Sequence, residues 1–192
     1  FNQAKTVNDT IKEYPDYDYY SIINSDDLYL PCFVEEHLMA FDEDPEALMC
    51  HSYAIFFQED PENLRAFNWG GWDIKKGLLE LNQNYICHPT VMIRKEAFES
   101  LGYFDEEFEF AYDFEFWQRM ICGGVNIKFI PKFTALYRIR NNNLTNTRGE
   151  KIKKEHGEIV NRAKLYVKEP AKRRIAITLD FIQVSDDFYY KE

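Results

Sequence analysis

Two carboxylates directly follow a short apolar run near the start of the chain. Residues 19–23 (YYSII) are aromatic or β-branched, and the run stops abruptly in Asn24, Ser25, Asp26 and Asp27. Carboxylate oxygens are ligands that Mg²⁺ and Mn²⁺ prefer. The turn is therefore a candidate site for a divalent cation. Acidic turns before helices are also commonly helix caps or solvated loops, and that interpretation stays open.

A third carboxylate, Asp113, stands at the start of a second aromatic stretch (DFEFWQR). The helical spacing of Phe114, Trp117 and Ile121 predicts a helix that ends at Gly123. At its N-cap, Asp113 would accept hydrogen bonds from the first free amides of that helix. An ionised carboxylate among aromatic rings can also act as a general base toward a hydroxyl group. The two roles are compatible.

Composition narrows the classes of partner. The formal net charge of −10 argues against nucleic acid, because phosphate backbones are bound mainly through Lys and Arg. An anionic diphosphate would need a cation held by protein carboxylates. No apolar run approaches the roughly 18 residues that cross a bilayer. The cysteines are widely spaced without a C-x-x-C pair, which favours reduced thiols in a cytoplasmic protein over a zinc site or a disulfide framework.

The elements that must position these carboxylates alternate between strands and helices, which predicts an α/β fold. We expect helices up to residue 12, from Pro31 to residue 42, over 74–81, 96–101 (stopped by Gly102), around 114–121 and over 150–167. We expect strands over 19–23, 48–57, 85–93, 125–130, 133–139 and, as an edge strand, 175–184. One domain over 1–145 and a C-terminal extension over 146–192, with a helix and a strand, follow from this order.

Residues 19–31 (YYSIINSDDLYLP) resemble the D-x-D segment of family-two glycosyltransferases, inverting enzymes of the GT-A fold. Segments that resemble the acceptor side of that family follow in order at 88–94 (HPTVMIR), 102–108 (GYFDEEF), 113–119 (DFEFWQR) and at Tyr137-Arg138. The resemblance covers about residues 3–145. It implies a GT-A-like (Rossmann-like) mixed sheet flanked by helices, N-terminally truncated because the strands that bind the donor base would lie upstream.

The resemblance also implies a role for each matching residue. Asp26 matches the ligand of the metal, Mn²⁺ or Mg²⁺, on the donor diphosphate, and Asp27 is a supporting ligand. Asp113 matches the base that deprotonates the acceptor hydroxyl. The family's donor-binding positions fall on Asn24, Asp26, Arg138 and Arg140.

Two of these positions depart from the family pattern. Many members have aspartate where this chain has Asn24, which adds no charge and lowers the expected metal affinity. Many members have histidine where Arg140 stands. Arginine cannot ligate a metal, and we expect Arg140 to contact a phosphate directly.

The implied partners are a nucleotide sugar, a UDP-sugar in the first place, and a glycan or lipid-linked acceptor in polysaccharide biosynthesis. We expect a cytoplasmic location, free or at the inner face of the membrane. We also expect the 192 residues alone to be weakly active or inactive, because the upstream donor region is missing. The alternative is a carbohydrate-binding or interaction domain, derived from a glycosyltransferase, that has no catalytic activity.

Overall fold

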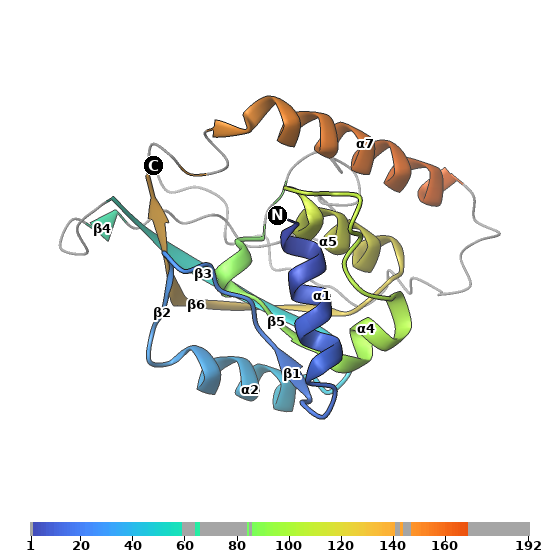
Figure 1. The fold of residues 1–192 in the computed structure, drawn as a ribbon. Helices are drawn as coiled ribbons and strands as arrows, with labels where there is room; N and C mark the ends of the chain where they lie inside the picture. The colour runs from blue at the N-terminus through green and yellow to red at the C-terminus, as the bar shows by residue number, and fades with distance from the viewer. Residues whose placement is uncertain are drawn as a thin grey trace, which may run out of the picture.

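The computed structural model describes residues 2–58, 64–65, 84, 86–140, 143 and 147–168, which form a mixed sheet flanked by helices (Figure 1). The helices are α1 (Gln3–Glu13), α2 (Phe33–Glu43), α4 (Lys95–Leu101), α5 (Tyr112–Cys122) and α7 (Gly149–Lys168), with a 3-10 turn, η1 (His88–Thr90). The strands are β1 (Tyr19–Tyr20), β2 (Leu28–Tyr29), β3 (Met49–Gln58), β4 (Leu64–Arg65), β5 (Met92–Arg94) and β6 (Ile127–Ile139). The α/β prediction is confirmed.

The strand order is β1-β5-β3-β6-β2, and β4 pairs with β3. Strands β3 and β6 run parallel along their whole paired length, from Met49 opposite Ile127 to Gln58 opposite Ile139. The other described pairs are antiparallel. The chain between β1 and β2 therefore crosses from one end of the strand order to the other, and this crossing segment carries the acidic turn.

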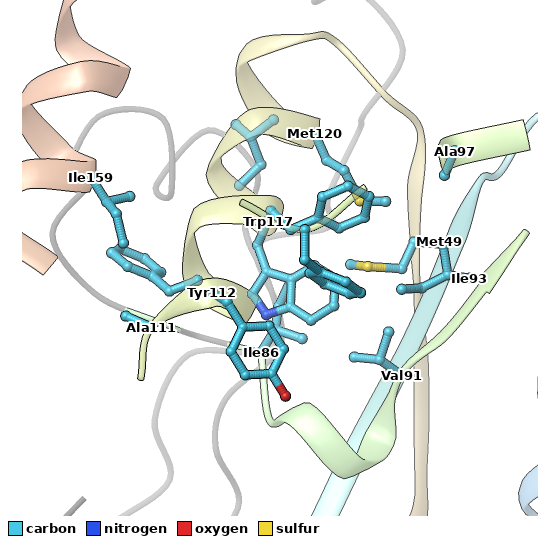
Figure 2. Packing of buried hydrophobic residues seen from close by; sticks show 14 of the residues in the cluster. Met49, Ile86, Val91, Ile93, Ala97, Ala111, Tyr112, Trp117, Met120 and Ile159 are labelled. Carbon is cyan, nitrogen blue, oxygen red and sulfur yellow. The ribbon is translucent and has the colours of Figure 1, made fainter. Parts of the chain in front are cut away.

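Helices cover both faces of the sheet because its strands alternate their apolar side chains. Helix α2 packs on the face formed by Cys50, Met92 and Ile130. Helices α1, α4 and α5 pack on the opposite face, with the neighbouring positions Met49 and Ile93. In Figure 2 the indole of Trp117, from α5, lies over this second face, and Ile159 reaches toward the same core from α7.

Two predicted strands are shorter than expected. The run over 19–23, predicted as one strand, forms only β1, whose two residues are half-buried at the end of the strand order. In the run over 85–93, Pro89 lies in the turn η1, and only β5 joins the sheet. Proline has no N–H group for a strand ladder, which accounts for the short β5.

Strand β6, in contrast, is longer than expected. The sequence predicts separate strands over 125–130 and 133–139, whereas one strand runs from Ile127 to Ile139. Its register with β3 shifts after the pair Ser52–Ile130, so that Tyr53 faces Phe133. The skipped residues Pro131 and Lys132, followed by Thr134 at a second shift between Tyr53 and Ala54, form an irregularity that accommodates the proline without ending the strand.

The structure describes one of three further predicted elements. The helix predicted over 150–167 is observed as α7. The helix over 74–81 and the edge strand over 175–184 lie outside the described residues. Within the described ranges, no helix is long and apolar enough to cross a membrane.

Gly102 ends α4 as predicted, and its backbone conformation gives a test of the fold. Its φ of 81° and ψ of 176° lie in a region that almost only glycine adopts. Gly102→Ala should therefore lower the free energy of unfolding by about 1–3 kcal/mol. The added Cβ would be only in ordinary contact with Arg119, so the cost is conformational. Urea unfolding, followed by circular dichroism, measures the difference.

The matched control is Gly157→Ala. Gly157 lies inside α7 with nothing within 4 Å of an added Cβ. Because alanine is the better helix former, the control should gain up to about 1 kcal/mol. Equal effects of the two substitutions would contradict a special backbone conformation at Gly102.

Candidate active site

The acidic turn is fixed to β6 by hydrogen bonds. Asp27 is 5% exposed, and its Oδ1 accepts a hydrogen bond from the backbone N–H of Arg138 at 2.9 Å. Its Oδ2 receives a longer contact of 3.4 Å from Asn24 Nδ2. In return, Arg138 Nε donates to the carbonyl oxygen of Asp26 at 3.0 Å. Hydrogen bonds thus link the acidic turn to the end of β6.

The register of β2 with β6 explains this contact. Leu28 lies opposite Leu136 in an antiparallel pair, so the residues just before Leu28 approach those just after Leu136.

The guanidinium of Arg138 lies 4.4 Å from the centroid of the Phe57 ring on β3. Burial raises the pKa of the Asp27 carboxyl, and the hydrogen bond from Arg138 N–H opposes that rise.

Asp113 is not the N-cap of α5. The N-cap is Ala111, which makes no side-chain cap hydrogen bond, and Asp113 is the second residue of the helix. Its Oδ1 accepts from the N–H of Phe114 at 2.7 Å. The N-cap interpretation of the sequence is therefore wrong. A negative charge in the first turn still interacts favourably with the helix dipole.

Aromatic and imidazole side chains surround Asp113. The rings of His88 and Tyr112 meet edge to face at 5.7 Å, and the ring of His156 lies 4.4 Å from that of Phe114. Burial lowers the pKa of both histidines, and the negative charge of Asp113 opposes that shift. Burial raises the pKa of the Tyr112 hydroxyl, and the Asp113 charge adds to the rise.

The thiol of Cys87, just before η1, is affected by the charges of both the acidic turn and Asp113. Burial raises the pKa of this thiol, and the charges of Asp27 and then Asp113 raise it further. The structure groups Asn24, Asp26, Asp27 and Arg138 in one hydrogen-bonded cluster, whereas Asp113 lies in the first turn of α5. Arg140 is exposed and follows the last residue of β6.

The acidic turn offers few ligands of its own. No three His, Cys, Asp or Glu side chains within the described ranges are grouped so that they could hold a metal ion. Asp26 and Asp27 are adjacent carboxylates, and Mg²⁺ is commonly bound through one or two carboxylates together with the phosphates of a substrate. The residues present fit a metal of that kind, one that binds with the diphosphate.

The neighbouring carboxylates are occupied in other contacts. Asp105 forms an ion pair with Arg162, and Glu115 forms one with Arg119. Glu106 accepts a hydrogen bond from the amide of Asn8 at 3.0 Å. A cavity of about 350 Å³ between α5 and α7 is lined by several of these ion-pairing side chains and does not include Asp113.

Three residues near Asp113 were not identified from the sequence. Cys87 has no motif around it, and the effect of the Asp27 and Asp113 charges on its pKa depends on the fold. Glu155 and His156 belong to α7, whose charged pattern is that of a solvated helix face. Their contacts with residues 109–114 carry no local signal that could have indicated them.

Comparison with known proteins identifies the fold. No family model and no curated protein matched the chain. A crystal structure of S. aureus TarS 1–349 in complex with UDP is similar, with a TM-score of 0.56 and 15% identity over 85% of this chain and 45% of that one. Another structure of TarS 1–349 gives 0.59 and 13% over 90% and 48%, and one of TarS gives 0.52 and 12% over 82% and 29%.

The chain spans less than half the length of these TarS structures. At such low identity the similarity concerns the fold alone. TarS is a glycosyltransferase, and the fold of the present chain is therefore glycosyltransferase-like.

Substitutions at Asp27 test its structural contact with β6. In metal-free protein at pH 7, Asp27→Ala leaves the N–H of Arg138 without its acceptor, whereas Asp27→Asn keeps an acceptor oxygen. Asp27→Ala should therefore be less stable than Asp27→Asn by about 1–3 kcal/mol. Equal stabilities in urea unfolding would show that the contact contributes nothing.

The pH dependence of stability tests the burial of the same carboxyl, which outweighs the opposing effect of the Arg138 hydrogen bond on its pKa. Because the pKa of Asp27 is raised, the folded protein binds this proton more tightly than the unfolded chain does. The stability that this bound proton contributes is complete below the pKa of the carboxyl in the unfolded chain, about 4, and is lost as the pH rises through its pKa in the folded protein. Asp27→Asn should remove that slope from a series of unfolding curves at increasing pH.

Proposed function

We propose that the chain is the metal- and acceptor-side part of an inverting glycosyltransferase of the GT-A, family-two type. The reaction moves a sugar from a nucleotide diphosphate, a UDP-sugar in the first place, to a hydroxyl group of a glycan or lipid-linked acceptor. The glycosyltransferase-like fold and the UDP bound to one similar structure support this proposal. A cytoplasmic location stays a prediction.

The observation that carries the proposal is the acidic turn, which hydrogen bonds with Arg138 hold at the end of β6 in a glycosyltransferase-like fold. Asp113, in the first turn of α5, supplies a second carboxylate from a separate element. A sugar-transfer site needs one carboxylate group beside the donor diphosphate and another beside the acceptor hydroxyl. We assign the first role to the acidic turn and the second to Asp113, which lie on separate elements.

The acidic turn forms the donor side of the proposed site. Asp26 and Asp27 hold the cation, Mn²⁺ or Mg²⁺, which when bound offsets the negative charge of the departing diphosphate. Arg138 orients the turn through its hydrogen bonds to Asp27 and Asp26. Arg140, exposed after the end of β6, contacts a phosphate as a charged donor.

Asp113 forms the acceptor side. The acceptor oxygen bonds to the anomeric carbon on the face opposite the diphosphate, the bond to the diphosphate breaks, and Asp113 takes the hydroxyl proton. Inversion follows from this single displacement. Asp105, Glu106 and Glu115 are held in other contacts, which supports Asp113 as the base and leaves these three poorly suited as nucleophiles.

Asp113→Asn is the experiment that tests the proposal. It removes the proton acceptor while changing few contacts, so in the full-length protein kcat should fall about 10²–10⁴-fold with the Kd for the donor within a fewfold. Initial rates of sugar transfer and calorimetric titration with donor provide the two readings. Asp42→Asn, an exposed aspartate of α2, is the matched control and should keep the parental rate.

A parental rate for Asp113→Asn would contradict the assignment of the base. If the chain is instead a binding domain without catalytic activity, the unsubstituted protein should release no nucleotide from the donor in the presence of Mn²⁺. Because Asp113 is not the N-cap, both Asp113→Asn and Asp113→Ala should change the free energy of unfolding by no more than about 1 kcal/mol.

Asn24→Asp tests the metal on the donor side. The amide of Asn24 lies 3.4 Å from Asp27 Oδ2, so a carboxylate there repels Asp27 unless a cation binds. The variant should melt at a lower temperature without metal and show a larger rise in Tm with Mn²⁺ than the parent. Asp26→Ala should lose Mn²⁺-dependent turnover. Retention of parental activity and metal dependence by Asp26→Ala would exclude Asp26 as a ligand.

A further inference from the structure

The segment that leads into α5 is held by one carboxylate from α7. Glu155 Oε1 accepts a hydrogen bond from the N–H of Glu109 at 3.1 Å, and its Oε2 accepts from Phe110 at 3.0 Å and from Ala111 at 2.8 Å. These are three consecutive backbone amides, and Ala111 is the N-cap of α5. A single side chain therefore binds the whole approach to the helix that carries Asp113.

Glu155 binds the N–H of the N-cap residue Ala111 and of the two residues before it, whereas a side-chain cap usually binds the N–H of the second or third helical residue. The amides at the start of a helix lack partners within the helix, and the side chain of Ala111 cannot provide one. Hydrogen bonds to an ionised carboxylate are stronger than those between neutral groups. The direction in which α5 begins consequently depends on Glu155, more than forty residues later in the chain.

The next residue of α7 contacts the chain on the C-terminal side of Asp113. The ring of His156 lies against that of Phe114, with centroids 4.4 Å apart. One turn later, Ile159 is buried in the core that α5 shares with α7, as Figure 2 shows. Successive residues of α7 thus contact the chain up to two residues before Asp113 and one residue after it.

Another residue of α7 binds the segment between α4 and α5. Arg162 forms ion pairs with Asp105 at 3.1 Å and with Glu107 at 2.9 Å, and its guanidinium lies 4.8 Å from the centroid of the Phe108 ring. The whole segment from Asp105 to Phe114 is therefore anchored on α7. The anchor is rigid where Glu155 binds because three donors fix one carboxylate.

We propose that Glu155 is a positioning residue for sugar transfer, which fixes the start of α5 and thereby aims the carboxylate of Asp113 at the acceptor hydroxyl. This proposal rests on the proposed role of Asp113 as the base. Reactions of this kind are sensitive to geometry, and a misplacement of about 1 Å can cost about 10²-fold in rate. Glu155 itself does not touch the reacting atoms.

The test compares Glu155→Gln and Glu155→Asp in the full-length protein. Glu155→Gln loses the charge and turns an N–H₂ group toward backbone donors, so kcat should fall at least about tenfold while the KM for the donor stays within about twofold. Glu155→Asp keeps the charge on a shorter side chain and should recover part of the loss. The control, Glu150→Gln, removes a charge from an exposed position of the same helix and should keep the parental kcat.

Combination with Asp113→Asn separates positioning from general destabilisation. If Glu155 acts through Asp113, Glu155→Gln should cause little further loss of kcat in the Asp113→Asn background. A full additional loss in that background would overturn the proposal, as would a parental kcat for Glu155→Gln beside an inactive Asp113→Asn. An active Asp113→Asn would instead overturn the proposed function, so the two failures are distinguishable.

Hydrogen exchange gives a readout that does not need activity. In Glu155→Gln the amides of Glu109, Phe110 and Ala111 should exchange faster than in the parent, whereas those of β3 should not change. Unchanged exchange at the three amides would show that the carboxylate does not hold them, and would overturn the proposal even where kcat falls. The Glu155→Asp variant permits the same measurement if Glu155→Gln does not fold.

Discussion

The pairing of β6 with two neighbours is the constraint on which the candidate site depends. Its parallel pairing with β3 fixes the strand in the sheet, and its antiparallel pairing with β2 brings the acidic turn against Arg138. The backbone amide of Arg138 then binds the buried carboxylate of Asp27. The acidic turn lies on the segment that crosses the sheet between β1 and β2, so its position depends on these contacts with β6.

Negative charge is concentrated where the strands and α5 meet. Asp27 is buried, Asp113 stands at the start of a helix, and both act on the thiol of Cys87 in a chain with a net charge of −10. Such an arrangement repels a free diphosphate and attracts a cation. Under the proposed function, the anionic donor and the metal are therefore bound together, and each makes the binding of the other more favourable.

Helix α7 connects this site with the end of the described chain. The segments that resemble family-two glycosyltransferases end before it, yet its side chains contact the residues on both sides of Asp113. The Asp105–Ala111 segment is also held from the opposite direction, since the buried Asn8 of α1 makes hydrogen bonds with Phe104 and Glu106. Two helices that are remote in sequence thus define the position of one loop.

Local patterns were sufficient to predict much of the fold. The helical spacing in α2 and α5, the glycine that ends α4 and the apolar run of β3 identify these elements, because each depends on neighbouring residues. The acidic turn after the first strand and Asp113 at the start of a helix were recognisable for the same reason. The lengths of β1, β5 and β6 were mispredicted, because pairing partners decide where a strand ends and how it accommodates a proline.

Only the tertiary structure decided how these parts meet. The sequence contained both acidic elements, but the strand order that brings the acidic turn against β6 is encoded in no local pattern. The sequence also suggested that Asp113 caps its helix, whereas Glu155 supplies the carboxylate that binds the preceding amides. That contact could not be predicted, because its partners are backbone N–H groups, and every residue type except proline offers the same N–H group.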